Sequence, residues 1–355
     1  MKSKISIKGY DLLGHAGNDG IRYAWTHTGS NQLLESAAFP QHRKDTRDNI
    51  CGYTTSVSLG CILRQIGYAC RFCKTGALLQ FKDLLSPLDI AKQNVFMVLS
   101  DINCSDHRMS MHSPREFAYM GQGEPGYSYA QLRLAIKLTD IVMEKLGQKV
   151  YRHIVSTAGI PEMIEAYKYD LRSNFYKNRV TLHYSLHATN GRQSIMPIDE
   201  KYSYHLVLNS MQDVKSLSGE KPCIGILLFN EYSPRNSSVS YTNDLVHIKE
   251  ILRFINPACF RLSFCEFNAC EEVGTSRNYN QAMANDVLEY AIKMGYESKL
   301  FSSFGKDESS ACGMLGGKEP FKHPGLKWFD LEKETEKLLI EAYETYSDYT
   351  EHKGE

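Results

Sequence analysis

The sequence predicts an α/β fold in which the strands form a parallel sheet, wound open or closed into a barrel. From about residue 85 onward, short strand patterns alternate with longer helical patterns, which is typical of consecutive strand–helix–strand units. The chain has 355 residues and is 42% hydrophobic, so it can fill one large core or two ordinary ones. In such sheets the functional site lies at the carboxyl ends of the strands.

The elements are expected in a regular order along the chain. Ser86, Pro87 and Asp89 are typical of a helix start, with Ser as the N-cap, and predict a helix that ends at about residue 99. Strands are expected at residues 22–27, 33–39, 116–120, 153–157, 180–186, 224–229, 261–267 and 299–304. Helices are expected at residues 129–146, 161–169, 203–217, 243–255 and 279–294, with a surface helix at 330–349.

Charge and hydropathy narrow the class of protein. Lys and Arg number 41 and so do Asp and Glu, which removes a global basic charge as an argument for nucleic-acid binding but leaves room for a local patch. One such patch is the loop at residues 41–47, which can equally be a solvated run of charges. No apolar run is long enough for a membrane span, and the N-terminus has no secretory apolar region. We therefore expect a soluble, cytoplasmic protein.

Ten cysteines suggest metal or thiol chemistry, because a reducing compartment disfavours a disulfide scaffold. Cys70 and Cys73 form a CxxC motif, and Cys61 precedes them in a loop before the helix that starts near Ser86. Alone, this spacing fits zinc, a redox pair or an iron–sulfur cluster with one open iron. We find no second CxxC or His pair for zinc, and Arg-Phe between the thiols suits a thioredoxin-like motif poorly. Cys104, Cys223 and Cys259 are expected to be ordinary core residues.

Clusters of polar residues follow the predicted strands. Each cluster alone is weak evidence of a functional site, but all of them are expected at one edge of the sheet. They are Gly121-Gln-Gly-Glu124-Pro125, Ser156-Thr-Ala-Gly159, Ser185-Leu-His187-Ala, Met196-Pro-Ile198, Phe267-Asn268 and Ala311-Cys312-Gly-Met-Leu315. A lone histidine is more often structural than functional, and Ser, Thr and Asn are ordinary turn residues. The six motifs in this order are a much more specific indication of function than any one of them alone.

Together these motifs resemble the RlmN/Cfr family of radical S-adenosylmethionine (SAM) methyltransferases, over residues 19–315. Two departures stand out. The family spaces its cluster cysteines CxxxCxxC, whereas here Cys61 precedes Cys70 by nine positions, so either Cys61 or Cys51 is the third ligand. The family's N-terminal accessory domain, which helps to hold RNA, is expected to be missing, because 18 residues precede the start of the resemblance.

The resemblance implies a partial (β/α)6 radical SAM barrel over residues 51–316, with a small β-rich N-terminal extension over 1–50 and a tail helix within 317–355. It implies a [4Fe-4S] cluster on Cys61, Cys70 and Cys73, and SAM bound at its open iron. SAM contacts are implied for Glu124, Ser156, Ser185, His187 and Asn268.

The implied reaction is methylation of an sp² carbon of adenine, which is a poor nucleophile and therefore needs a radical route. By resemblance, Cys312 carries a methyl group from one SAM, and a radical formed from a second SAM activates that methyl for attack on the ring. Cys51 then resolves the protein–substrate adduct, and Glu35 assists proton movement. For Glu35, a solvated acid at a strand end is the equally weighted alternative.

The implied partners are RNA as substrate and a flavodoxin-type electron donor, with the protein itself a monomer. Two alternatives remain open from the residues. The same chemistry can act on a small nucleotide-type or secondary-metabolite substrate, or the CxxC can build a non-catalytic zinc-bound nucleic-acid-binding module.

Overall fold

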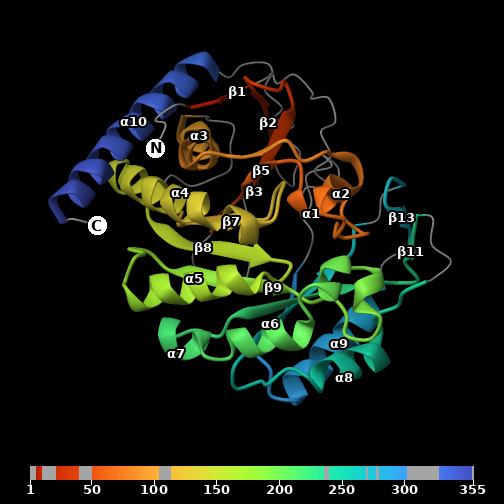
Figure 1. The fold of residues 1–355 in the computed structure, drawn as a ribbon. Coiled ribbons are helices and arrows are strands. Elements are labelled where there is room, and N and C mark those ends of the chain that lie inside the picture. Colours follow the sequence, from red (N-terminus) through yellow and green to blue (C-terminus); the bar gives the residue numbers. More distant parts are fainter. Residues whose placement is uncertain are drawn as a thin grey trace.

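An open ten-stranded sheet forms the centre of the molecule, with helices packed along its outer face (Figure 1). The structure is a computed structural model that describes residues 5–9, 21–39, 50–103, 113–235, 240–268, 271–276, 280–301 and 328–353. The strand order in the sheet is β1-β2-β3-β4-β7-β8-β9-β10-β12-β14. Its strands are β1 (Ile7–Gly9), β2 (Ile21–His27), β3 (Leu33–Phe39), β4 (Cys51–Thr54), β7 (Arg115–Tyr119), β8 (Val150–Thr157), β9 (Val180–Ser185), β10 (Cys223–Leu228), β12 (Arg261–Glu266) and β14 (Ser298–Phe301).

The strands from β4 to β14 are all parallel, and each crossover passes through helices. This confirms the α/β class and the partial barrel. The crossover helices are α3 (Pro87–Asn103), α4 (Pro125–Lys145), α5 (Pro161–Arg172), α6 (Tyr204–Met211), α7 (Val214–Ser218), α8 (Leu245–Leu252) and α9 (Gln281–Lys293). The single helix expected at 203–217 is therefore two helices, α6 and α7.

The N-terminal strands extend the same sheet. β1 pairs antiparallel with β2, β2 with β3, and β3 with β4. Two small antiparallel sheets lie near the carboxyl ends of the parallel strands: β5 (Ser58–Leu59) pairs with β6 (Asp83–Leu84), and β11 (Ser233–Pro234) pairs with β13 (Gly274–Thr275). The same region contains four short helices, α1 (Ile62–Gln65), α2 (Lys74–Leu78), η1 (Arg192–Ser194) and η2 (Pro197–Glu200). The extension is thus continuous with the barrel strands.

The long helix α10 (Trp328–Lys353) packs beside α3 and α4, on the side of β1 (Figure 1). Lys92 of α3 is fully buried there, and its Nζ lies 2.6 Å from Glu332 and 2.7 Å from Glu336 of α10. The same ammonium donates to the carbonyl of Ile7 in β1 at 2.7 Å. One buried lysine therefore joins three elements that are far apart in the sequence. No helix in these described stretches combines the length and apolar character that a membrane crossing needs.

The two faces of the sheet differ in exposure. Side chains alternate between faces along a strand, so one set packs under the helices and the other lines the concave side, which we call the inner face. Residues on the helix side, such as Phe117, Val155, Tyr184, Ile224 and Phe264, are buried. Those of the inner face that are half-exposed are Ala118, Ser156, His183, Ser185, Gly225, Arg261, Cys265 and Lys299. The inner face is therefore accessible and polar.

Candidate active site

The three predicted cluster cysteines lie in one loop region at the carboxyl end of β4. Cys61 follows β5 and precedes α1, whereas Cys70 and Cys73 lie between α1 and α2. The loop is tied to later segments of the chain, because the backbone N–H of Arg71 donates to the carbonyl of Ile195 at 2.9 Å. Tyr232 also donates its hydroxyl to the carbonyl of Arg71 at 3.0 Å. The cysteine loop is thus held against the segments that follow β9 and β10.

The thiols of this loop influence one another. Burial, followed by the neighbouring Cys73 thiol, raises the pKa of Cys61 to about 12. Burial also raises the pKa of Cys70 well above its usual value, and the Cys73, Cys61 and Glu124 side chains act in the same direction. Three thiols therefore converge beside one carboxylate, and this donor set includes Cys61.

A three-thiol donor set fits an iron–sulfur cluster, which takes thiolate ligands. Such a cluster spreads its three protein ligands over three irons, so it needs a wider arrangement than a single ion does. Across the residues that the structure describes, no three His, Cys, Asp or Glu side chains are arranged to hold one metal ion. Cys61, Cys70 and Cys73 are the residues that would hold the cluster.

Glu124 is fixed at the turn between β7 and α4. Its carboxylate accepts hydrogen bonds from the backbone N–H of Gly126 at 2.8 Å, the backbone N–H of Ala158 at 2.9 Å and the hydroxyl of Thr157 at 2.5 Å. Burial raises the pKa of Glu124, and these three bonds partly oppose the shift. A carboxylate offers about four acceptor positions, so room remains for one further donor, such as an ammonium group.

The glycines on either side of Gln122 allow this turn to pack closely on the cysteine loop. A Cβ at Gly121 would lie 2.8 Å from the backbone N of Ser56, and Gly123 has a positive φ of 106°. Gln122 itself is fully buried, and its carbonyl accepts from the backbone N–H of Val57 at 2.9 Å. The Gly-Gln-Gly-Glu-Pro motif therefore holds the loop in place as well as presenting Glu124.

His187 lies two residues after the end of β9, in a left-handed backbone conformation with φ of 60°. Its Nδ1 accepts a hydrogen bond from the backbone N–H of Leu227 at 3.1 Å, which leaves Nε2 to carry the proton. Burial, followed by the charge of Arg192, lowers the pKa of His187 to about 3. Its ring meets Phe72 edge-on at 4.9 Å, so a neutral imidazole is held against the CxxC loop.

Arg192 is a site residue that sequence reasoning missed. It is completely buried, and its guanidinium donates to the carbonyls of Leu186 at 2.9 Å and of Ser185 and Ala158 at 3.1 Å. It also pairs with Asp199 at 2.8 Å. Arg192 thus fixes the ends of β8 and β9 relative to each other. In the sequence, Arg192 lies four residues before the Met-Pro-Ile motif, and this position could have marked it as a candidate site residue. Its hydrogen-bond partners could not be predicted from the sequence.

The remaining predicted SAM contacts lie on the same side of the sheet. Ser156 of β8 and Ser185 at the end of β9 are inner-face residues, and Asn268 follows the end of β12 by two positions. Thr157, which was expected only as part of a turn, bonds Glu124 instead. The structure therefore gathers the five predicted SAM contacts at the carboxyl edge of the parallel strands.

Glu35 lies within β3 and is fully buried, so the alternative of a solvated strand-end acid is wrong. Its carboxylate lies 3.4 Å from the Arg22 guanidinium. The carbonyl of Glu35 accepts from the hydroxyl of Ser56 at 2.5 Å, and Ser56 in turn accepts from the backbone N–H of Gln122 at 2.8 Å. Glu35 is therefore brought to the edge where the cysteine loop and Glu124 meet.

The structure does not bring Cys51 to this edge. Cys51 is the first residue of β4, level with Arg115 at the start of β7, and its pKa is raised to about 11 by burial, with Arg115 and Asp101 as its charged neighbours. Thr54 ends the strand at the edge where the cysteine loop begins. Because β4 runs away from Cys51 toward the site, Cys51 lies apart from the other predicted site residues, and its role as a third ligand or a resolving thiol stays a prediction. Cys312, Cys104 and the basic loop at 41–47 lie outside the described residues.

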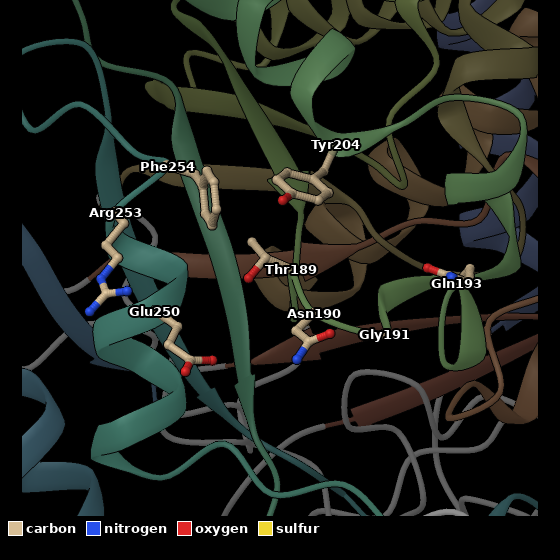
Figure 2. Close-up of a pocket in the computed structure, with 8 residues that line it drawn as sticks. All are labelled: Thr189, Asn190, Gly191, Gln193, Tyr204, Glu250, Arg253 and Phe254. Atoms are coloured by element: carbon tan, nitrogen blue, oxygen red, sulfur yellow. The ribbon is translucent and has the colours of Figure 1, made fainter.

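A hollow of about 460 Å³ lies beside the loop after β9 (Figure 2). Tyr204 and Phe254 lie at one end of it, and Asn190 and Glu250 lie toward the other. Its lining comes from the 189–193 segment, the start of α6 and the end of α8. None of the predicted site residues that the structure describes lines this hollow.

Comparison with known proteins agrees with this architecture. The dual-specificity RNA methyltransferase RlmN of Pseudomonas fluorescens is 26% identical over 330 residues, covering 89% of this chain and 76% of that protein. The ribosomal RNA large subunit methyltransferase Cfr of Shouchella clausii is 28% identical over 295 residues, covering 81% and 73%. The chain resembles the RlmN/Cfr family. No protein-family model matches it.

A crystal structure of a radical SAM methyltransferase from Sphaerobacter thermophilus shares the fold of this RlmN/Cfr-like chain. The TM-score is 0.67 at 18% sequence identity, and the match covers 88% of this chain and 82% of the other. The resemblance inferred from ordered motifs is thus confirmed by whole-chain similarity, and the partial barrel by a solved structure.

Proposed function

We propose that this RlmN/Cfr-like protein methylates an sp² carbon of adenine in RNA by radical SAM chemistry. One observation carries the proposal: the thiols of Cys61, Cys70 and Cys73 converge beside the buried carboxylate of Glu124, at the carboxyl edge of a parallel sheet. RNA as substrate follows from the names of the relatives, RlmN and Cfr.

When bound to the three thiolates, a [4Fe-4S] cluster would supply the electron that cleaves SAM. The protein's own residues then bind and orient SAM. Glu124 has one acceptor position left for the amino group of SAM, since Gly126, Ala158 and Thr157 occupy the others. His187 holds its Nε2 proton in a fixed tautomer and can donate to a hydroxyl or carboxylate oxygen.

In this proposal Cys312 carries the methyl group, and Glu35 holds or moves a proton near the reacting ring. Burial suits Glu35 to that task, because a carboxylate sheltered from water exchanges protons with a bound substrate rather than with solvent. We assign Cys51 no part in the transfer, because its thiol lies at the opposite end of β4.

The test is the Cys312→Ala variant, compared with wild type after anaerobic reconstitution. Mass spectrometry of RNA from cells with and without the gene identifies the methylated nucleoside, and the purified protein is examined for one extra methyl on Cys312. We expect Cys312→Ala to retain its iron and to cleave SAM slowly, yet to transfer no methyl group. Full methyl transfer by Cys312→Ala would rule out the carrier role.

A further inference from the structure

A buried positive charge that the proposed chemistry does not use lies at the carboxyl edge of the sheet. The side chain of Arg192 is completely enclosed, whereas that of its carboxylate partner Asp199 is 11% exposed. The guanidinium is engaged on every nitrogen: Nη1 pairs with the carboxylate, Nε donates to the carbonyl of Leu186, and Nη2 donates to those of Ser185 and Ala158. What this side chain can still supply to its surroundings is its charge.

Backbone hydrogen bonds join Arg192 to the cysteine loop. Arg192 begins the short helix η1, and Ile195 directly follows that helix. The backbone N–H of Ile195 donates to the carbonyl of Arg192 at 3.0 Å, and the carbonyl of Ile195 accepts from the backbone N–H of Arg71 at 2.9 Å. Arg71 is the residue after Cys70 in the CxxC motif. The turn that carries the buried charge is therefore held against the cysteine pair.

The charge of Arg192 acts on side chains of the site. Burial and then the neighbouring thiols raise the pKa of Cys70, and the charge of Arg192 opposes them. Burial, followed by Arg192, lowers the pKa of His187 to about 3. Asp199 makes no such contribution to His187, but it does contribute, together with Arg192, at Tyr184 on the helix side of the sheet. The positive end of this ion pair is therefore the end nearer to the site.

We propose that the buried charge of Arg192 raises the reduction potential of a [4Fe-4S] cluster held by Cys61, Cys70 and Cys73. This inference rests on the proposed function for the presence of the cluster. One electron enters the cluster from an external one-electron reductant and no proton accompanies it, so a fixed cation nearby stabilises the reduced form. Charge and solvent exposure are among the factors that set such potentials. Glu124 is the nearby acid that acts in the opposite direction, and in the proposed function the amino group of SAM neutralises it.

The experiment measures the midpoint potential of the anaerobically reconstituted full-length protein, without SAM or RNA. Dithionite is the reductant, and electron paramagnetic resonance follows the reduced cluster. The variants are Asp199→Asn, Arg192→Met and Arg192→Lys. The partly buried ion pair of Arg133 with Asp170, between the outer helices α4 and α5, supplies the matched controls Arg133→Met and Asp170→Asn. Thermal unfolding and iron assays check that each variant is folded and holds its cluster.

We expect Asp199→Asn to raise the midpoint potential by about 59 mV, which is a tenfold change in the ratio of reduced to oxidised cluster for one electron. The reason is that the charge of Arg192 is then no longer balanced. Arg192→Met should lower the potential by a similar amount. Arg192→Lys should stay near wild type, because it keeps the charge while it loses the planar fork of hydrogen bonds. The two control variants should leave the potential unchanged.

The sign of the shifts separates an electrostatic role from a structural one. Loosened packing at the strand ends would move Asp199→Asn and Arg192→Met in the same direction, whereas a charge effect moves them in opposite directions. Shifts of the same sign, an unchanged potential in Asp199→Asn, or an equal shift in the controls overturns the proposal. If Arg192→Met fails to fold, the comparison of Asp199→Asn with Arg192→Lys and the controls still decides.

The two proposals fail in different ways. If the potentials shift as expected but no RNA is ever methylated, the role of Arg192 stands without the proposed reaction. If wild type methylates RNA and Asp199→Asn has the potential of wild type, the reaction stands and the role of Arg192 is wrong.

Discussion

Cys61 and Cys51 differ in their surroundings, and these surroundings favour Cys61 over Cys51 as the proposed iron ligand. The Cys61 thiol lies among Cys70, Cys73 and Glu124, whereas Cys51 lies among Ser113, Arg115 and Asp101. A ligand must face the other ligands, and spacing along the chain cannot show that. The nine-residue separation of Cys61 from Cys70 is accommodated by the short helix α1.

We predict that Cys61→Ala loses its cluster and Cys51→Ala keeps it. Anaerobically reconstituted wild type should hold about four iron and four sulfide per chain, as a [4Fe-4S] cluster requires. Iron and sulfide assays with the absorbance spectrum of each variant make the measurement. Retention of iron by Cys61→Ala together with its loss from Cys51→Ala would reverse the assignment.

His187 predicts a pH dependence of stability. Its folded pKa of about 3 lies below the unfolded value of 6.5, so the folded protein resists a proton that the unfolded chain accepts. The contribution is fully present above pH 6.5 and is lost as the pH falls from 6.5 toward 3, with a slope of up to about 1.4 kcal/mol per pH unit.

We expect His187→Asn to reduce the slope of the unfolding free energy against pH between 6.5 and 5, as measured by urea unfolding. Asn is chosen because it tolerates the positive φ at this position. His205→Asn, at an exposed histidine, is the control and should leave the slope unchanged. An identical slope in wild type and His187→Asn would contradict the assignment of a buried neutral ring.

At the scale of secondary structure, the start of α4 combines a structural and a functional task. Glu124 is the N-cap residue of α4 through its bond to Gly126, and it also joins β7 to the end of β8 through Thr157 and Ala158. An acidic cap favours the positive end of the helix dipole. The same carboxylate therefore stabilises the turn and is pre-positioned for a cation.

We predict that Glu124→Gln weakens SAM binding by about tenfold or more, because a charge-assisted hydrogen bond to the amino group is lost. The cap is also weakened, at a cost of about 1 kcal/mol in unfolding free energy. Asp244→Asn is the matched control, since Asp244 caps α8 by accepting from Val246 and His247. Equal SAM affinity in Glu124→Gln and wild type, measured by equilibrium binding, would remove Glu124 from the site.

At the scale of the whole molecule, the C-terminal helix completes the packing of the first crossover helix. α10 covers α3 and α4, and Lys92 joins α3, α10 and β1 in one buried contact. β1 and α10, the first and last elements of the described chain, are thereby both joined to α3. Losing the lysine would leave two acids beside a buried carbonyl.

We expect Lys92→Met to lower the free energy of unfolding by about 3 kcal/mol, as removal of one partner from a buried ion pair does. Lys145→Met is the control: Lys145 pairs with Glu341 on the same helix, but at the surface. That variant should unfold like wild type in urea. Equal destabilisation by both variants would contradict the role given to burial.

Local patterns in the sequence predicted most elements to within a few residues. The N-cap at Ser86 was correct, since Ser86 accepts from the backbone N–H of Asp89 at 3.1 Å. The alternation of strands and helices gave the parallel sheet, and it missed β1 and β4, which are only three and four residues long. Short strands carry too few residues for an alternating pattern to be recognised.

The sequence by itself determined the family resemblance, the cysteine loop and the motifs at the strand ends, because these depend on residues close together in the chain. Only the tertiary structure decided that Cys51 lies at the far end of β4 and that Glu35 is buried beside Arg22. Those facts depend on strand register and on which face each side chain occupies. A shift of one residue reverses both, so they follow from long-range pairing rather than from local pattern.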